Sequence, residues 1–347
     1  MRPLHLLALS LVLIAGCNRG GDSASSGGSN SGKKLRIVYI PKNTGNPYFD
    51  EVNRGFEDAA KEIGADYATT APATADATSQ VPIIKEQIQR GVDVIAISAN
   101  SPDALNQVLD EAKSRGITVI TVDADLVGNE SHRDAAVLPA DFNQIGPSQV
   151  ELLGKLTNYE GDFAILSATA DAPNQNAWIA KMKDALKDPK YAKMHLVDLV
   201  YGDDAPEKSS TECEALLAKH PGLRGIISPT SVGLAASAQV VERAGVYPKG
   251  PHASGQGLQL TGLSTPNQLK KFVDNGVVSA FQLWAPYNEG YIAVYLGRQI
   301  HDKTLKPSAG TEFATKKFGK QKFSDKLELI GGPLQTFDKS NVAQFNF

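Results

Sequence analysis

The stretch LRIVYIPKNTGNPYFDEVNRGFEDAAKEI, from Leu35 to Ile63, predicts a strand, a loop and a helix in that order. Residues 35–40 form a short apolar run rich in β-branched side chains, which is typical of a strand buried on both faces. From Phe49 onward, apolar residues recur at the three- and four-residue spacing of one helix face. Such a unit begins a parallel α/β sheet, in which ligands bind at the carboxyl ends of the strands.

The loop between this strand and this helix brings polar and aromatic side chains to the ligand-binding edge. It contains Lys42 and Asn46, and the aromatic pair Tyr48 and Phe49 follows. Hydrogen-bonding groups beside aromatic rings are typical of a small-molecule site. An alternative interpretation is that Tyr48 and Phe49 only cover the hydrophobic core.

Strand and helix patterns alternate along the rest of the chain. Apolar runs predict further strands over 92–98, 117–122, 135–138, 162–167, 195–201, 225–228, 258–263 and 277–283. Helical patterns lie between most of these runs, one of them beginning at Ser101, and a loop is expected over 168–176. Residues 326–337 are expected to form a hairpin around Gly331. The alternation predicts an α/β fold with two doubly wound parallel sheets.

The composition is that of a globular protein and argues against two classes of function. A chain of 347 residues suggests about two domains. The net charge of −3 offers no basic surface for nucleic acid. No apolar run reaches the roughly 18 residues that a membrane-spanning helix needs.

The N-terminus resembles the signal of a bacterial lipoprotein over residues 1–17. A short apolar segment precedes Ile14-Ala15-Gly16-Cys17, and in such signals the chain is cut before the cysteine, whose thiol then carries lipid. The alternative is plain secretion with an incidental cysteine. Residues 18–33 are rich in Gly and Ser and predict a flexible tether. We therefore expect an exported protein anchored by a lipid on Cys17, with the other cysteine, Cys213, buried as a small core residue.

Motifs for common enzymatic and metal chemistry are missing from the sequence. The stretch GGSNSGKK resembles a phosphate-binding loop, but Lys34 stands where Ser or Thr should be, and the stretch precedes the first strand. Motifs for dinucleotides, zinc or a serine nucleophile do not occur, and the histidines are scattered. The sequence therefore favours a binding protein without cofactor or metal over an enzyme, and an enzyme on the same scaffold stays open as an alternative.

Polar and aromatic residues recur at the predicted strand ends. Carboxylate and amide groups can each take two hydroxyl hydrogen bonds, and aromatic faces can cover the C–H surface of a sugar ring. The set therefore predicts a site for a small neutral polyol. Its members are Asn46, Tyr48, Phe49, Asp123, Asn174, Gln175, Asn176, Trp178, Thr230, Ser231, Ser264 and Trp284.

Seven motifs make the chain similar to the sugar-binding solute-binding proteins of bacterial ABC transporters, in the periplasmic group related to ribose-binding proteins. Within this group the chain most resembles the branch of rhamnose-binding proteins and autoinducer-2 receptors. The motifs are IPKNTGNPYFDEVNRG (40–55), ISANSPDAL (97–105), GDFAILSATADAPNQNAW (161–178), YGDD (201–204), ISPTSVG (227–233), TGLSTPN (261–267) and FQLWAPYNEGY (281–291).

This resemblance implies a type I periplasmic binding protein fold, with two lobes joined by a hinge of three chain crossings. One lobe is expected over 34–139 plus 286–307, and the other over 140–285 plus 308–347. The ligand closes the lobes about the hinge, as a population shift. The closed form then docks on an ABC permease, or on a chemoreceptor or sensor. A monomer is expected.

The resemblance also implies which positions contact the ligand. They are Lys42, Asp123, Asn174, Gln175, Pro229 and Ser231. Asn-Gln-Asn at 174–176 matches the rhamnose type, whereas TGLSTPN at 261–267 is closer to the autoinducer-2 type. We expect capture of rhamnose or a similar deoxy sugar, with autoinducer-2 binding for uptake or sensing as the alternative.

Overall fold

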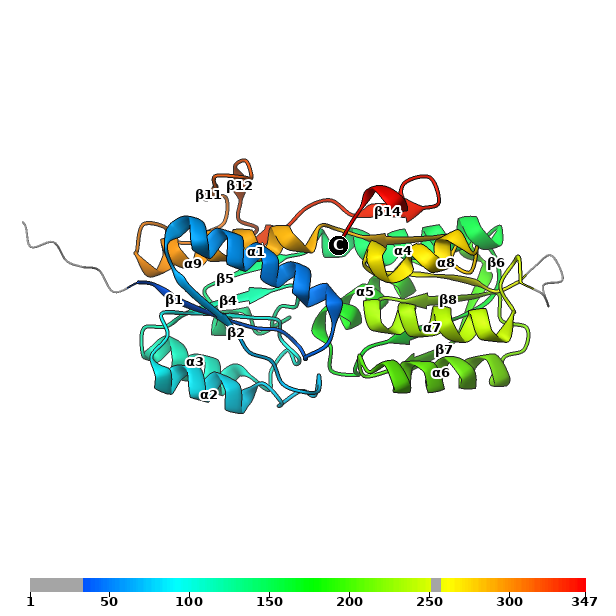
Figure 1. Cartoon of the computed structure of the whole chain (residues 1–347), viewed down its shortest axis with the longest axis horizontal. Helices are drawn as coiled ribbons and strands as arrows, with labels where there is room; N and C mark the ends of the chain where they lie inside the picture. The colour runs from blue at the N-terminus through cyan, green and yellow to red at the C-terminus, as the bar shows by residue number, and fades with distance from the viewer. Residues whose placement is uncertain (1–33, 251–256) are drawn as a thin grey trace, which may run out of the picture. The chain divides into compact units, whose positions relative to one another are not determined.

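The computed structural model describes residues 34–250 and 257–347 (Figure 1). The expected lipoprotein signal, the tether and Cys17 therefore lie outside the described residues. Within the described ranges, helices alternate with strands, and the strands form two parallel sheets. The predicted α/β fold class is confirmed.

The first sheet has six strands in the order β13-β5-β4-β3-β1-β2, and every neighbouring pair is parallel. Its strands are β1 (Arg36–Ile40), β2 (Asp66–Thr69), β3 (Val94–Ile97), β4 (Thr118–Val122), β5 (Ala135–Leu138) and β13 (Glu328–Ile330). The strand order changes direction between β1 and β3, where ligand sites of such sheets lie. β2 was not predicted, because its sequence DYAT is short and partly exposed at the edge of the sheet.

Helices cover both faces of the first sheet, as Figure 1 shows. On β1, Ile37 and Tyr39 pack in the core that includes α1 (Pro47–Ile63) and α9 (Pro286–His301). Val38 and Ile40 pack on the opposite face with α2 (Val81–Arg90) and α3 (Asn106–Ser114). Because successive side chains of a strand point to opposite faces, this double cover explains the continuous apolar run of β1.

The helices α1 and α9 approach each other at a pair of glycines. A Cβ atom on Gly55 would lie 2.0 Å from the carbonyl oxygen of Tyr287, and one on Gly290 would lie 2.1 Å from that of Val52. Neither position has room for a side chain. The close approach brings the beginning of α9 next to the middle of α1.

The second sheet has the order β7-β6-β8-β9, again with parallel pairs. Its strands are β6 (Glu160–Ser167), β7 (Lys193–Tyr201), β8 (Gly225–Ser228) and β9 (Gln259–Gly262). One face packs against α4 (Phe142–Thr157) and α5 (Pro173–Ala185), and the other against α6 (Pro206–Lys219) and α7 (Ser231–Ala244). Beyond β9 lie α8 (Pro266–Asp274) and β10 (Ala280–Leu283), which pairs antiparallel with β14 (Gln335–Asp338).

The chain passes between the two sheets three times: after β5, after β10, and between β13 and β14. The last passage corrects the predicted hairpin around Gly331, because β13 pairs with β5 and β14 pairs with β10. Turn-forming residues mark where a strand ends, but they do not say which strand it joins. Part of the segment 308–347, expected with the second lobe, thus belongs to the first sheet. The tail also contains the short pair β11 (Glu312–Phe313) and β12 (Gln321–Lys322).

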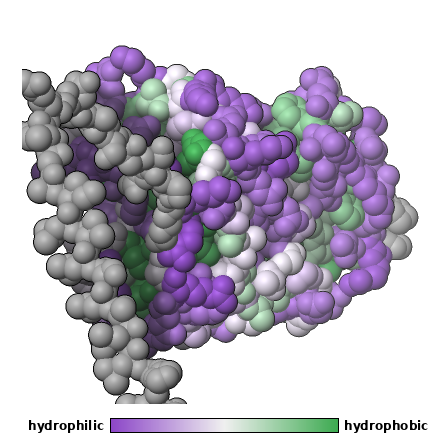
Figure 2. All heavy atoms as spheres, turned by 60° about the vertical axis from the view of Figure 1, so that its left-hand side comes forward, coloured by the Kyte–Doolittle hydropathy of each residue, from purple (hydrophilic) through white to green (hydrophobic). Residues whose placement is uncertain are grey.

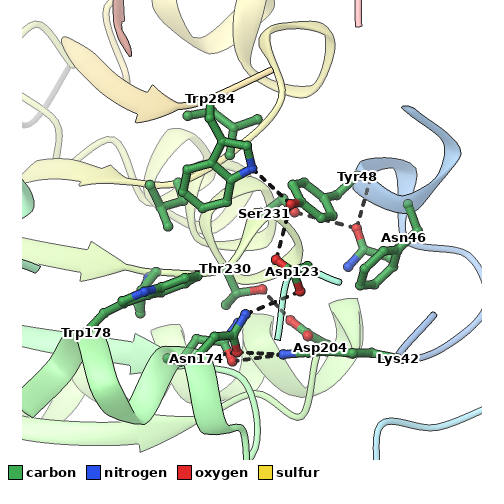
Figure 3. A pocket seen from close by; sticks show the side chains of 15 residues that line it. Lys42, Asn46, Tyr48, Asp123, Asn174, Trp178, Asp204, Thr230, Ser231 and Trp284 are labelled. Carbon is green, nitrogen blue, oxygen red and sulfur yellow. Dashed lines mark hydrogen bonds between the residues drawn. The ribbon is translucent and has the colours of Figure 1, made fainter. Parts of the chain in front are cut away.

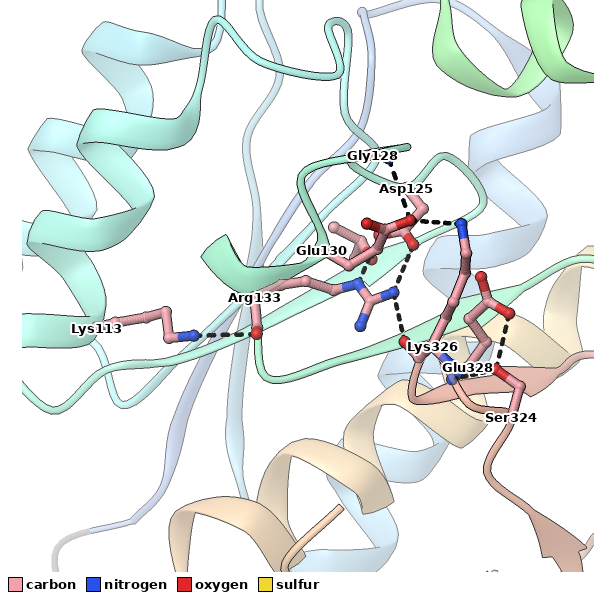
Figure 4. A network of polar contacts seen from close by, with 9 residues as sticks. Lys113, Asp125, Gly128, Glu130, Arg133, Ser324, Lys326 and Glu328 are labelled. Carbon is pink, nitrogen blue, oxygen red and sulfur yellow. Dashed lines mark hydrogen bonds and ion pairs between the residues drawn. The ribbon is translucent and has the colours of Figure 1, made fainter. Parts of the chain in front are cut away.

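A buried ion pair holds β13 against the first sheet (Figure 4). Arg133 donates to both carboxylate oxygens of Asp125, at 2.6 Å each, and to the carbonyl oxygen of Lys326 at 2.9 Å. Thr121 donates to the same carboxylate at 2.6 Å. The Arg133 side chain is fully buried, so its two bonds to Asp125 form without competition from water, and its third bond, to the Lys326 carbonyl, reaches the segment before β13. At the surface, Lys326 also pairs with Glu130.

Two helix boundaries differ from the sequence prediction, and the second of them concerns the site. α3 begins at Asn106, because Ser101 Oγ accepts from the backbone nitrogens of Asp103 and Ala104 and caps a separate turn before the helix. α5 begins at Pro173, so the Asn-Gln-Asn stretch lies in its first turn instead of in the expected loop. Cys213 is fully buried, as predicted.

Hydrophilic residues cover most of the face in Figure 2, with hydrophobic residues in small groups between them. In the described part of the chain, the large hydrophobic side chains classed as exposed are Val127 and Ile330. None of the helices in these ranges is long and apolar enough to span a membrane.

Candidate functional site

A cavity lies where the carboxyl ends of the strands of both sheets meet, with about 340 Å³ of space between its lining atoms, open solvent included. The segments after β1 and β4 contribute from the first sheet, and those after β6, β7, β8, β9 and β10 from the second. The lining residues are Lys42, Asn46, Tyr48, Phe49, Asp123, Asn174, Gln175, Trp178, Asp204, Pro229, Thr230, Ser231, Leu263, Leu283 and Trp284 (Figure 3).

The structure brings together all but two of the residues that the sequence predicted for the site. Asn176 is exposed and donates to the carbonyl oxygen of Ala170 at 2.7 Å. It lies two positions after Asn174 on α5, and helix geometry turns it to the other side. Ser264 is buried behind the wall, where its hydroxyl lies 3.2 Å from Gln268 Oε1, while its neighbour Leu263 lines the cavity.

Three lining residues were missed by the sequence analysis, of which Asp204 is the most polar. It follows β7 in the YGDD stretch, so the position after that predicted strand was the available signal. Its φ of 51° is left-handed, a conformation that aspartate tolerates better than most residues. Thr230 donates a hydrogen bond to the Asp204 carboxylate, and burial raises the pKa of Asp204. The other two are apolar: Leu263 directly follows β9, and Leu283 ends β10.

Polar side chains from the two sheets bond directly to each other across the cavity. Lys42 Nζ donates to Asn174 Oδ1 at 2.7 Å and lies 3.4 Å from Gln175 Oε1. Asn174 Nδ2 in turn donates to Asp123 Oδ2 at 3.3 Å. Figure 3 shows Lys42 reaching Asn174 from the opposite side of the site. A second contact across the cavity joins Ser231 Oγ and Asn46 Oδ1 at 3.5 Å.

Two carboxyl groups surround the single buried cation of this lining. Burial lowers the pKa of Lys42, and the charges of Asp123 and Asp204 oppose that shift. Burial also raises the pKa of Asp123 to about 6, even though Lys42 and the Tyr48 hydroxyl favour its ionised form. Asp123 is therefore a carboxylate near neutral pH that is close to protonation.

The backbone of Asp123 turns its side chain into the cavity. Its φ is 65°, directly after β4, and the residue donates its backbone N–H to the carbonyl oxygen of Val137 on β5. A left-handed residue at a strand end is strained for most side chains and marks functional positions more often than others. Here it places a carboxylate at the carboxyl end of β4, inside the cavity.

Aromatic rings form the apolar side of the cavity. Trp178 and Trp284 meet edge to face with their centroids 5.8 Å apart, and Tyr48 meets Trp284 in the same way at 6.2 Å. Trp178 lies four residues after Asn174 on α5, so both side chains share one helix face. This wall presents ring surface opposite the polar group formed by Lys42 and Asp123.

The Tyr48 hydroxyl connects the cavity to a glutamate behind it. Tyr48 Oη lies 3.1 Å from Asp123 Oδ1 and 2.7 Å from Glu289 Oε1, and it accepts from Trp284 Nε1 at 2.9 Å. Burial, followed by the charge of Asp123, raises the pKa of Glu289 well above its usual value. Glu289 was not predicted for the site, although an acidic residue at a core position of a helix is a recognisable sequence signal.

The chain matches known proteins over the whole of this arrangement. The family model described as periplasmic binding protein domain matches residues 37–304. These residues contain every segment that lines the cavity.

Three solved structures illustrate the likeness. An ABC transporter solute binding protein from Clostridium phytofermentas, with bound L-rhamnose, is 32% identical with a TM-score of 0.84, covering 90% of this chain and 98% of that one. A sugar ABC transporter protein from Actinomyces odontolyticus is 34% identical with a TM-score of 0.70 and the same coverage, 90% and 98%. LsrB from Clostridium saccharobutylicum, in complex with AI-2, is 22% identical with a TM-score of 0.82 over 90% of this chain and 100% of LsrB, which supports the fold alone.

Proposed function

Because this chain belongs to the periplasmic binding protein domain family, we propose that it is the sugar-binding protein of an ABC transporter and binds L-rhamnose or a similar deoxy sugar. The observation that carries the proposal is the bonded group of Lys42, Asp123 and Asn174. It comes from both sheets and shares one cavity with two tryptophan rings. We propose the predicted lining residues as the ligand contacts.

The chemistry of the cavity suits a monosaccharide with a methyl group. Asp123 can accept from sugar hydroxyls, Lys42 can donate to them, and Asn174 can do both. The tryptophan rings can cover the C–H face of the sugar ring. The apolar residues Leu263 and Leu283 add a surface for the methyl carbon that distinguishes a deoxy sugar.

Two further observations support L-rhamnose as the ligand. The Clostridium phytofermentas protein, which is 32% identical over 90% of this chain, was solved with L-rhamnose. The Asn-Gln-Asn stretch at 174–176 resembles the rhamnose type, and its first two residues line the cavity.

Autoinducer-2 remains the second candidate ligand. Its support came from the motif TGLSTPN at 261–267, but only Leu263 of that motif lines the cavity. Most residues of this autoinducer-2-like motif therefore lie outside the cavity lining. This distribution favours the deoxy sugar.

Ligand binding is proposed to close two lobes about the three chain crossings. The first lobe is residues 34–139 with 286–307, to which β13 adds a strand, and the second is residues 140–285 with the end of the chain. Contacts made by one ligand to both Lys42 and Asn174 exist only when the lobes are together. Such contacts shift the population toward the closed form.

The closed protein is proposed to deliver its sugar to a permease at the membrane, with a chemoreceptor or sensor as the alternative partner. The support for anchoring is the sequence around Cys17, which resembles a lipoprotein signal. Replacing Cys17 with Ser should move the protein from the membrane fraction of its host to the soluble fraction. A wild-type protein that keeps an uncleaved leader and fractionates as soluble would reject the anchor.

The test of ligand identity is a thermal-shift screen followed by calorimetry. A ligand that binds only the folded state raises the unfolding midpoint. L-rhamnose should raise it, whereas ribose and glucose should raise it less at equal concentration. A midpoint that responds to autoinducer-2 and to none of the deoxy sugars would replace the proposed ligand with the alternative.

A further inference from the structure

Glu289 is a buried carboxyl group that the proposed sugar site does not touch. It lies in the first turn of α9, is fully buried, and does not line the cavity. Its Oε1 atom contacts Tyr48, whereas its Oε2 atom has no hydrogen-bond partner within the described ranges. An ionised carboxylate in such a place is costly, because its charge is neither solvated nor paired.

The Tyr48 hydroxyl has three polar neighbours but only one proton. Trp284 Nε1 can only donate to it, at 2.9 Å. The carboxyl oxygens of Asp123 and Glu289 lie at 3.1 and 2.7 Å. Ionised carboxylates only accept, so one hydroxyl cannot bond to both of them if both are ionised. For both bonds to form at once, one of the two carboxyl groups carries a proton and donates it to Tyr48.

The partners of Asp123 identify it as the ionised member of the pair. Its Oδ2 atom accepts from Asn174 Nδ2 at 3.3 Å, and the charge of Lys42 favours the carboxylate. Each of these interactions stabilises negative charge on Asp123.

The surroundings of Glu289 favour the protonated form instead. The titratable groups that face it are Tyr48 on α1, Tyr39 on β1 and Asp123 after β4, and Trp284 after β10 adds its N–H. Within residues 34–250 and 257–347, no lysine, arginine or histidine forms an ion pair with Glu289, and the one nearby charge is the negative charge of Asp123.

We propose that protonated Glu289 is a positioning residue for the sugar site. It donates its proton to Tyr48 Oη, so the single Tyr48 proton points at Asp123 Oδ1 and holds that carboxylate in place. Asp123 then faces the ligand as a pure acceptor, and the ligand must present a hydroxyl donor there. The part of the inference that concerns the sugar rests on the proposed function, whereas the place of the proton does not.

Ionisation of Glu289 reverses this arrangement. The Tyr48 proton then turns toward the new carboxylate, and Asp123 loses its donor while gaining a like charge nearby. Because the pKa of Glu289 is raised well above its usual value, this change occurs only as the pH rises past the range in which carboxyl groups ordinarily titrate. Sugar affinity should fall there.

The place of the proton can be tested without any ligand by infrared spectroscopy. A protonated carboxyl group has a C=O stretch that is separate from that of a carboxylate. The wild-type protein should show this band at neutral pH, and Glu289→Gln should lose it. The matched control is Glu62→Gln, because Glu62 also accepts from tyrosine hydroxyls, at 2.6 Å from Tyr291 and 2.8 Å from Tyr295, but its pKa is lowered. A spectrum unchanged by Glu289→Gln would overturn the proposal.

The positioning role is tested by calorimetry with L-rhamnose across the pH range. Gln can donate to Tyr48 as protonated Glu does but cannot ionise, so Glu289→Gln should bind well at neutral pH and lose affinity only at a higher pH than the wild type. The difference should reach about tenfold, the effect of one charge-assisted hydrogen bond. Superimposable pH profiles would refute the positioning role. If L-rhamnose binds neither protein, the proposed ligand fails, and the infrared result still decides where the proton lies.

Discussion

Asp123 and Asp125 both follow β4, both are buried, and they have different partners. Asp125 accepts two bonds from Arg133 and one from Thr121, all at 2.6 Å, so its oxygens are fully occupied by the protein. Asp123 accepts from Tyr48 and Asn174 at 3.1 and 3.3 Å, longer bonds that leave it facing a cavity. Saturation by permanent partners, more than burial, therefore separates a structural carboxylate from one that can bind a ligand.

The largest expected effect comes from breaking the ion pair between Arg133 and Asp125. Arg133→Met should lower the free energy of unfolding by about 3–5 kcal/mol, because it leaves Asp125 charged and buried without a cation. Urea unfolding followed by circular dichroism measures this change. The matched control is the double variant Arg133→Met with Asp125→Leu, which removes both charges and should recover much of the loss. A loss below about 1 kcal/mol in the single variant would show that the pair does not hold β13 in place.

Asp123→Ala should act on binding and leave the fold intact. Losing one or two charge-assisted hydrogen bonds, about 1.5–3 kcal/mol each, should weaken L-rhamnose binding by roughly tenfold to several hundredfold. Calorimetry gives the affinity, and a cooperative thermal transition confirms that the variant folds. Unchanged affinity in a folded variant would remove Asp123 from the site.

Asn174→Asp tests the hydrogen bond to Asp123 from the other side of the cavity. The amide donates to Asp123, whereas a carboxylate in its place would only accept and would face a like charge. We expect L-rhamnose affinity to fall by about tenfold and any autoinducer-2 binding to improve. Parallel titrations with the two ligands provide the measurement. A variant that binds L-rhamnose more tightly would contradict the proposed donor role of Asn174.

The smallest expected effect is a loss of sugar affinity at acidic pH. Asp123 accepts from hydroxyls only while ionised, and its pKa is raised to about 6. Affinity should therefore be full near neutral pH, fall about twofold where the pH equals this pKa and continue to fall as the pH decreases. Calorimetry of the wild type and of Asp123→Asn, which cannot lose a charge, checks the assignment. A loss of equal size in both proteins would assign it to another group.

The order of strands and helices could be predicted from the sequence because it depends on local periodicity. The buried run of β1 and the amphipathic face of α1 are properties of consecutive residues. The partner of β13 could not be predicted in this way, since it is β5, almost two hundred residues earlier in the chain. β2 escaped because an exposed edge strand lacks an apolar pattern.

Most of the candidate site could be predicted for a related reason. Polar residues after parallel strands meet at one edge, so Lys42, Asp123 and Asn174 were identified by position alone. Asp204 was not predicted as a site residue although it follows a strand, because the YGDD stretch served only as a motif of the family resemblance. Glu289 was not predicted for the site because its role depends on the Tyr48 hydroxyl from another helix, and no local sequence pattern contains that contact.

The direct bond between Lys42 and Asn174 has a consequence for the speed of capture. These two groups satisfy each other at 2.7 Å, so an incoming sugar exchanges one set of hydrogen bonds for another instead of adding new ones. The protein thereby competes with its own ligand, and the observed affinity is the difference between the two sets. At high sugar concentration, the association rate should stop rising and level off at the rate at which this bond breaks.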